Sequence, residues 1–145
     1  MGRQTLNLEP SDLQKNLKKF GFSADSGTIR HIPGNIWYSE DFFRFIGAKT
    51  VDSFDYSDYE GATYIHDMNK QINSSFKQQY SVVLDSGTLE HVFNFPIAIK
   101  NCMEMVQEGG YYLGITPVNN FMGHGIYQFS PELFSAYLPA LMALI

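Results

Sequence analysis

Apolar side chains recur at helical spacing near the start of the chain, where the pattern predicts a first short helix. This helix spans residues 11–20, with an apolar face and a glycine directly after it: Leu13, Leu17, Phe20 and Gly21. Ser11 and Gln14 have the spacing of a capping box, so we expect the helix to begin at Ser11.

A second helix is predicted from Ser39, the expected N-cap, to Gly47. Glu40 and Asp41 would lie in its first turn, where the helix dipole favours acidic side chains. Its apolar face is formed by Phe42, Phe43 and Ile46.

The segment between these two helices, residues 22–38, is rich in Gly, Ser and Pro and predicts a loop, with strand content near residues 28–32. We find neither an internal repeat nor a composition change that would mark a second domain. The sequence therefore predicts one domain over residues 1–145. Within it, residues 1–38 form an N-terminal extension and residues 39–145 form the core.

Beyond this point short apolar runs alternate with helical segments. Four strands are predicted, at residues 49–55, 62–66, 81–85 and 111–116. A helix over 95–106 lies between the last two strands, with Asn94 as its cap and Gly109-Gly110 closing it, and a further helix begins at Ser130 and should end near Pro139. Strands that alternate with helices predict an α/β fold with a mostly parallel sheet flanked by helices.

Composition narrows the class of partner. Apolar residues make up 44% of the chain and charged residues 17%, which is typical of a globular domain. The formal net charge of −5 and the scattered basic residues argue against a nucleic-acid interface, so we expect a small-molecule ligand. We find no apolar run long enough to cross a membrane and no signal peptide, and we expect a cytoplasmic protein. The single cysteine, Cys102, is expected to be a buried thiol.

Acidic residues follow three of the predicted strands. These residues are Asp55, Asp67 and Asp85, and the last is followed closely by Gly87. Ligands of open α/β sheets bind at the carboxyl ends of the strands, so the three carboxylates could hold the hydroxyls or the amine of a nucleoside. Asp is also common in turns, where its side chain bonds to the backbone, and that alternative remains open for each residue.

Two histidines are candidates for acid–base chemistry. His91 follows Glu90 directly after the third predicted strand, and His124 lies in a Gly-His-Gly loop. Either histidine could serve as a general base, or could only brace its loop. A metal site built from His66, Asp67, His91 and His124 lacks any recognised ligand spacing, so we expect no metal.

The run Tyr80–Val92, which reads YSVVLDSGTLEHV, resembles the fourth-strand motif of class I S-adenosylmethionine-dependent methyltransferases. The helix that follows and the sequence Gly109-Gly110-Tyr-Tyr-Leu resemble the next segment of that family. The strings DYSDYEGA from Asp55 and GHGIYQFSPELF from Gly123 are similar to a bacterial subgroup of such proteins. The resemblance covers about residues 40–134.

The resemblance implies a Rossmann-like fold and transfer of a methyl group from S-adenosylmethionine to a small-molecule or sugar-like acceptor. The residues that it assigns to the cofactor are Asp55, Tyr56, Asp67, Met68, Asp85 and Gly87. His91 or His124 would act as the base for the acceptor. Contacts to the acceptor would come from Glu90, Asn119, Asn120 and Tyr127.

The sequence departs from the family pattern in two ways, and these departures leave other functions open. Upstream of Asp55 we find no Gly-x-Gly loop, which in the family lets the backbone approach the cofactor. The chain ends at Ile145, where the family continues with further strands, so we expect an incomplete sheet whose exposed edge pairs two copies into a homodimer. The alternative function is a catalytically inactive methyltransferase-like binding module or a truncated remnant. A different nucleoside-binding Rossmann-like enzyme is a third and weaker alternative.

Overall fold

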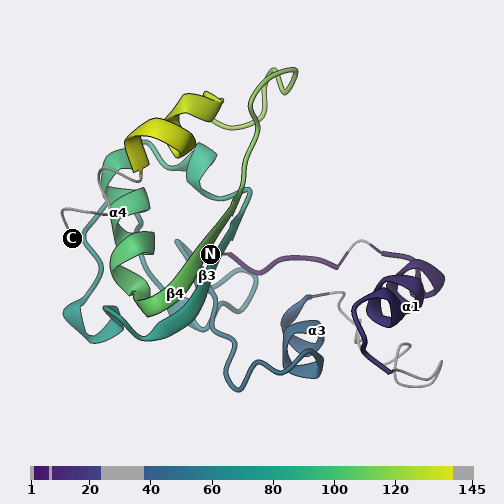
Figure 1. Cartoon of the computed structure of the whole chain (residues 1–145). Helices are drawn as coiled ribbons and strands as arrows, with labels where there is room; N and C mark the ends of the chain where they lie inside the picture. The colour runs from purple at the N-terminus through teal and green to yellow at the C-terminus, as the bar shows by residue number, and fades with distance from the viewer. Residues whose placement is uncertain (1, 7, 24–37, 139–145) are drawn as a thin grey trace.

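The computed structural model describes residues 2–6, 8–23 and 38–138 and combines helices with short parallel strands (Figure 1). Its α-helices are α1 (Pro10–Lys19), α3 (Glu40–Phe45) and α4 (Phe95–Met105). Its strands are β1 (Phe54–Asp55), β2 (Tyr64–Ile65), β3 (Tyr80–Ser86) and β4 (Val106–Ile115). Two 3-10 turns, η1 (Ser74–Phe76) and η2 (Leu89–His91), and a π-helix, η3 (Leu133–Tyr137), complete the described elements.

Helix α1 confirms the first predicted helix, but its start differs. Pro10 takes the first helical position, where its missing N–H costs nothing, and Glu9 becomes the N-cap without a side-chain capping bond. Ser11 therefore lies inside the helix, and the predicted capping box is wrong. The glycine stop is confirmed, because Gly21 has a φ of +81° and the Phe22 N–H donates to the Leu17 carbonyl at 2.9 Å.

Helix α3 confirms the second predicted helix and packs with α1. Its N-cap is Ser39, as expected, although the Ser39 side chain makes no capping bond. Apolar residues of the two helices form one small cluster together with Leu6, which precedes α1: Leu13, Leu17, Phe42 and Phe45. Thus α3 packs with the N-terminal helix, although it lies beyond residue 38, where we expected the core to begin.

The predicted parallel pairing is present in two separate two-stranded sheets. β1 pairs with β2, and β3 pairs with β4 through a register that joins Val82 to Tyr111 and Ser86 to Ile115. The described residues form no ladder between the two sheets. Side chains nevertheless join β1 and β3, because the Phe54 and Tyr80 rings meet edge to face with centroids 6.1 Å apart.

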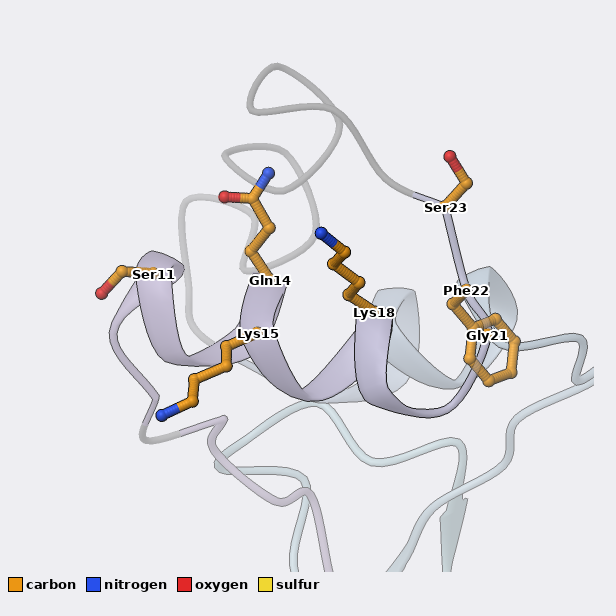
Figure 2. Close-up of a pocket in the computed structure, with 7 residues that line it drawn as sticks. All are labelled: Ser11, Gln14, Lys15, Lys18, Gly21, Phe22 and Ser23. Atoms are coloured by element: carbon orange, nitrogen blue, oxygen red, sulfur yellow. The ribbon is translucent and has the colours of Figure 1, made fainter.

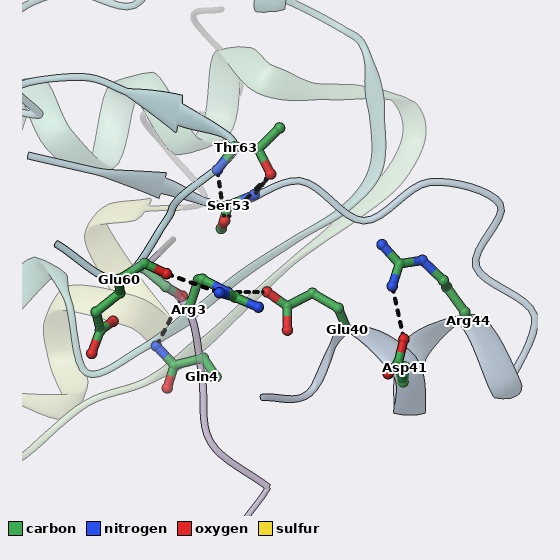
Figure 3. A network of polar contacts seen from close by, with 9 residues as sticks. Arg3, Gln4, Glu40, Asp41, Arg44, Ser53, Glu60 and Thr63 are labelled. Carbon is green, nitrogen blue, oxygen red and sulfur yellow. Dashed lines mark hydrogen bonds and ion pairs between the residues drawn. The ribbon is translucent and has the colours of Figure 1, made fainter. Parts of the chain in front are cut away.

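The first two strands are much shorter than the predicted segments 49–55 and 62–66. Just before them, Ser53 and Thr63 replace ladder bonds with side-chain bonds: the Ser53 N–H donates to Thr63 Oγ1, and the Thr63 N–H donates to Ser53 Oγ, both at 3.1 Å. Figure 3 shows this reciprocal pair. After β1, the Ser57 N–H bonds to the Asp55 carboxylate, which turns the chain away.

The junction between α4 and β4 also differs from the prediction. The helix ends at Met105 and β4 begins at the next residue, so the predicted closing pair Gly109-Gly110 lies inside the strand. A Cβ on Gly110 would lie 2.7 Å from the Ser81 carbonyl oxygen, so only glycine permits this approach of β4 to β3. The register shifts at the same place, between Tyr80 and Val82, as expected for a bulge.

The main core lies between α4 and one face of the β3–β4 sheet. Its buried members come from every part of residues 54–138 and include Phe54, Met68, Val83, Leu89, Ile99 and Met105. Buried Asn101 joins α4 to the segment before η1, because its side chain accepts the Ile72 N–H at 2.9 Å and donates to the Lys70 carbonyl at 2.7 Å. The opposite face of the sheet exposes apolar side chains: Val82, Tyr111, Leu113 and Ile115.

Residues 2–6 connect α3 to the β1–β2 region through Arg3 (Figure 3). The Arg3 guanidinium donates to Glu40 at 2.7 Å and to the Glu60 carbonyl at 2.8 Å, and it lies 3.7 Å from the centre of the Tyr38 ring. The hydrogen bond to Glu40 raises the pKa of Arg3. Arg3 therefore ties the two apolar clusters together.

Two further predictions concern the ends of the described chain. The helical turn after Ser130 is confirmed, because Ser130 Oγ accepts the Glu132 N–H at 3.3 Å, as an N-cap does. The expected strand content at 28–32 and the expected helix end at Pro139 lie outside the described residues. Within the described ranges, no helix is both long and apolar enough to cross a membrane.

Candidate functional site

The loop after β3 is built around Asp85, which is 1% exposed. Its Oδ1 accepts the Thr88 N–H at 3.0 Å and the Leu89 N–H at 3.3 Å, and its Oδ2 accepts the Tyr112 hydroxyl at 3.4 Å. Burial raises the pKa of Asp85, while the bond from Thr88 opposes that shift. The Asp85 side chain thus fixes the conformation of the loop, and both of its carboxylate oxygens accept hydrogen bonds from within the protein.

Two residues beyond Asp85, Gly87 allows the turn into η2. Its φ is +91°, a conformation that other residues rarely adopt, and its N–H donates to the Ile115 carbonyl at 3.1 Å. This bond ties the carboxyl ends of β3 and β4 together. The next residues, including Glu90, are therefore held at the edge where both strands end.

Glu90 fixes the loop that follows β4. Its backbone carbonyl accepts the N–H groups of Ile126 at 2.7 Å and Tyr127 at 3.0 Å. A Cβ on Gly125 would lie 2.9 Å from Glu90 Cγ, so the glycine at this position lets the loop approach. The Gly-His-Gly sequence is therefore packed against η2, with His124 beside the Glu90 side chain.

Three side chains meet at this point, and we call them the Glu90 cluster: Glu90, His91 and His124. The His124 Nε2 lies 3.5 Å from Glu90 Oε1, and the two imidazole rings are 5.0 Å apart at an angle of 74°. Glu90 is 1% exposed, whereas the His124 side chain is half exposed. Glu90 Oε2 is buried and has no hydrogen-bond partner among the described residues.

Asp55 and Asp67 each make the local turn that was the alternative to a ligand contact. Asp55 Oδ1 accepts the Ser57 N–H at 3.0 Å, and Asp67 Oδ1 accepts the Asn69 N–H at the same distance. The pKa of Asp67 is lowered first by the hydrogen bond from the Asn69 side chain and further by Lys70, whose ammonium lies 3.3 Å from Oδ2.

The carboxyl end of β1 nevertheless faces the loop after β3. A Cβ on Gly2 would lie 3.3 Å from Asp55 Oδ2 and 3.8 Å from Thr88 Oγ1. Gly2 therefore lies between Asp55 and Thr88. The N-terminal segment thus lies next to both the end of β1 and the loop after β3.

The remaining predicted residues are spread more widely. Met68 is 6% exposed and belongs to the main core, whereas Tyr56 is 75% exposed. Asn119 and Asn120 are exposed in the loop after β4, where Asn120 has a φ of +60°. The Tyr127 hydroxyl donates to the Phe93 carbonyl at 2.6 Å, which braces the loop.

A surface hollow on α1 contains none of the predicted site residues (Figure 2). Its lining comes from α1 and the turn after it: Ser11, Gln14, Lys15, Lys18, Gly21, Phe22 and Ser23. This set contains no acidic residue, histidine or cysteine, so it offers no acid–base pair. We therefore place the candidate site at the carboxyl ends of β3 and β4.

Sequence reasoning grouped His66 and Asp67 with His91 and His124, but these residues make different contacts in the structure. His66 Nε2 lies 3.3 Å from the Lys70 carbonyl oxygen, and Asp67 pairs with Asn69 and Lys70. His124 lies beside Glu90, a residue that we expected to contact the acceptor, and the His91 ring lies against the His124 ring. Two signals indicated the cluster: the Leu-Glu-His sequence after a buried strand and the glycines that flank His124.

Chemically, the Glu90 cluster pairs a buried carboxylate with an exposed imidazole, an arrangement that can orient a general base. Comparison of the chain with models of protein families, with curated proteins and with solved structures found no match. The functional argument therefore depends on this geometry and on the sequence motifs.

Proposed function

We propose that this protein transfers a methyl group from S-adenosylmethionine to a small-molecule or sugar-like acceptor. The observation that carries the proposal is the meeting of Asp55, the Asp85 loop and the Glu90 cluster near the carboxyl ends of parallel strands. Ligands of open α/β sheets bind at this end.

The placement of the strands supports a Rossmann-like arrangement. In the doubly wound order 3-2-1-4-5, the third and second strands pair, the fourth and fifth strands pair, and the first lies between the pairs. The resemblance equates β1 to β4 with the second to fifth strands, and the observed pairs are β1–β2 and β3–β4. Within the described ranges no strand lies between β1 and β3, which matches the missing Gly-x-Gly segment.

In this reaction Asp55 and His124 would have different roles. Asp55 would accept hydrogen bonds from the ribose hydroxyls through its Oδ2. His124, oriented by Glu90, would take the proton of the acceptor's hydroxyl or amine as that group attacks the methyl carbon. The carbon–sulfur bond breaks in the same step, and S-adenosylhomocysteine leaves.

Calorimetric titration with S-adenosylhomocysteine tests the cofactor site without knowledge of the acceptor. We expect binding by the wild type, loss of affinity by more than tenfold in Asp55→Ala, and unchanged affinity in Asp58→Ala, which removes an exposed acid three residues away. His124→Ala should bind as well as the wild type, because His124 would serve the acceptor. Failure of a folded wild-type chain to bind would exclude methyl transfer.

One observation favours the alternative, a catalytically inactive methyltransferase-like binding module. Gly2 lies against Asp55 Oδ2, the oxygen that the ribose would need. If the N-terminal segment keeps this place in solution, the cofactor cannot reach Asp55. The same titration decides between the two functions.

A homodimer was expected from an exposed sheet edge and remains a prediction. Among the described residues the β3–β4 sheet has two strands, so each strand has an edge at which a second copy could pair, and one face of this sheet exposes Val82, Tyr111, Leu113 and Ile115. Parallel sheets are usually covered on both faces, which supports an additional layer here. Sedimentation velocity would measure the association directly.

A further inference from the structure

We propose that the Glu90 cluster binds one divalent transition-metal ion, of which Zn²⁺ suits the ligands best. The site is formed by Glu90, His91 and His124, and it uses none of the residues that we assigned to the cofactor. A bound ion would be a departure from the sequence-based expectation of no metal. It would also occupy the His124 Nε2, so the metal-bound form of His124 is an alternative to its role as the general base. Two imidazoles and one carboxylate form a common ligand set for Zn²⁺ in proteins, and three protein ligands leave one coordination position for water or a substrate.

The distances support coordination with small movements. The donor atoms of the three side chains all lie within 4.8 Å of one another, and His124 Nε2 and Glu90 Oε1 are 3.5 Å apart. Two ligands of a tetrahedral zinc ion, each about 2.1 Å from the metal, are roughly 3.4 Å apart. The Glu90–His124 pair already has this spacing, and an exposed imidazole can turn to bring His91 closer.

Burial of the carboxylate is the second and independent observation. Glu90 is 1% exposed, and its Oε2 has no hydrogen-bond partner among the described residues. A buried carboxylate oxygen without a partner is costly, and a bound cation would remove that cost. His124 contacts the other oxygen of the same carboxylate, Oε1, so an ion held by the cluster would bind next to the oxygen that has no partner among the described residues.

The backbone around Glu90 holds the donors in place before an ion arrives. The Glu90 carbonyl is fixed by Ile126 and Tyr127, and the close approach of Gly125 sets the loop that carries His124. Two of the three ligands thus come from segments joined by backbone hydrogen bonds. The donor types also select the metal, because imidazole suits Zn²⁺ and related ions, whereas Mg²⁺ and Ca²⁺ prefer oxygen ligands.

Metal binding by the full chain tests this inference directly. After chelator treatment and its removal, the wild type is titrated with Zn²⁺ by calorimetry and with Co²⁺ by visible absorption, which reports four-coordinate geometry. We expect one ion per chain, and affinity reduced more than tenfold in His124→Ala and Glu90→Gln. His66→Ala is the matched control, because it removes a histidine outside the cluster, and it should bind like the wild type.

Several outcomes would overturn the proposal. These are no uptake by a wild type that circular dichroism shows to be folded, uptake that survives His124→Ala unchanged, or an equal loss in His66→Ala. His124 is half exposed, so its replacement should leave the fold intact even if Glu90→Gln fails to fold. No cofactor is present in these titrations, so the result is separate from that of the methyl-transfer test.

Discussion

At the scale of single residues, buried polar side chains set the geometry of the site. Asp85 accepts hydrogen bonds from two backbone N–H groups and from the Tyr112 hydroxyl. The Asn101 side chain accepts the Ile72 N–H and donates to the Lys70 carbonyl.

The Cys102 thiol is fully buried, as expected, and burial together with nearby Asp85 raises its pKa to about 12. Cys102 is therefore a packing residue in this fold.

The raised pKa of Asp85 predicts how the stability of the fold depends on pH. The folded protein holds the Asp85 proton more tightly than the unfolded chain, whose carboxyl has the ordinary pKa of 3.8. As pH rises from that value through the raised one, ionisation therefore lowers the free energy of unfolding, by about 1.4 kcal/mol for every pH unit that separates the two pKa values. Asp85→Asn removes the charge but can keep the hydrogen bonds, so its stability relative to the wild type should increase with pH.

Urea unfolding of both proteins at about pH 4.5 and about pH 8 measures this difference. Asp58→Asn, at an exposed position, controls for the general loss of one negative charge and should follow the wild type. Parallel pH profiles for Asp85→Asn and the wild type would show that the buried carboxyl is not the source of the effect.

Residue types predicted the positions of site residues better than their roles. The acidic residues were expected at strand ends, and Asp55 and Asp85 are found there. Their turn contacts depend on the backbone conformation of the following two residues, which the sequence pattern does not define. Glu90 was recognised through its motif, but its burial depends on the later loop at Gly125, more than thirty residues away.

At the scale of elements, long periodic segments were predicted well and short ones were not. The prediction of strand 81–85 is confirmed by β3, and helix 95–106 is confirmed by α4, to within a residue or two. Periodicity could not show that Ser53 and Thr63 exchange side-chain bonds, and this exchange limits β1 and β2. Nor could it distinguish a glycine pair that ends a helix from one that permits a bulge in the next strand.

That glycine pair yields a prediction about β4. Gly110→Ala would place a methyl group 2.7 Å from the Ser81 carbonyl oxygen and 2.8 Å from Val106 Cγ1, so one strand must move. Such overpacking costs roughly 1–3 kcal/mol in the free energy of unfolding. Glu108→Ala, at an exposed position of the same strand, should change it by less than about 0.5 kcal/mol. Urea unfolding compares the two variants, and equal stabilities would mean that β4 does not approach β3 so closely.

At the scale of the whole molecule, alternation of strands and helices predicted parallel pairing but not the division into two sheets. The hydrophobic pattern of a strand does not show whether a neighbouring strand is joined to it by backbone hydrogen bonds or only by side-chain contacts. β1 and β3 meet through Phe54 and Tyr80, and the Tyr80 hydroxyl donates to Asp52 at 3.0 Å. The position of α3 beside α1 likewise follows from contacts between distant segments, which local periodicity does not reveal.

The connection between the two apolar clusters is the last testable feature. Arg3 joins Glu40 of α3 to the Glu60 carbonyl, and the Arg3 and Glu40 side chains are only 25% and 15% exposed. Arg3→Ala would leave a largely buried carboxylate without its cation, at a cost of roughly 1–3 kcal/mol. The pair Arg44–Asp41 is a matched control within α3, because its side chains are 52% and 58% exposed and such pairs contribute at most about 1 kcal/mol.

Hydrogen exchange measured by mass spectrometry can locate the effect as well as its size. In Arg3→Ala we expect faster exchange at residues 2–6 and in α3. Exchange in β3 and α4 should be unchanged, because the contacts of Arg3 lie outside the main core. Arg44→Ala should exchange like the wild type. If both variants lose protection equally, Arg3 contributes no more than a surface charge. If protection falls throughout β3 and α4 as well, the two apolar clusters unfold as one unit, and Arg3 stabilises both of them.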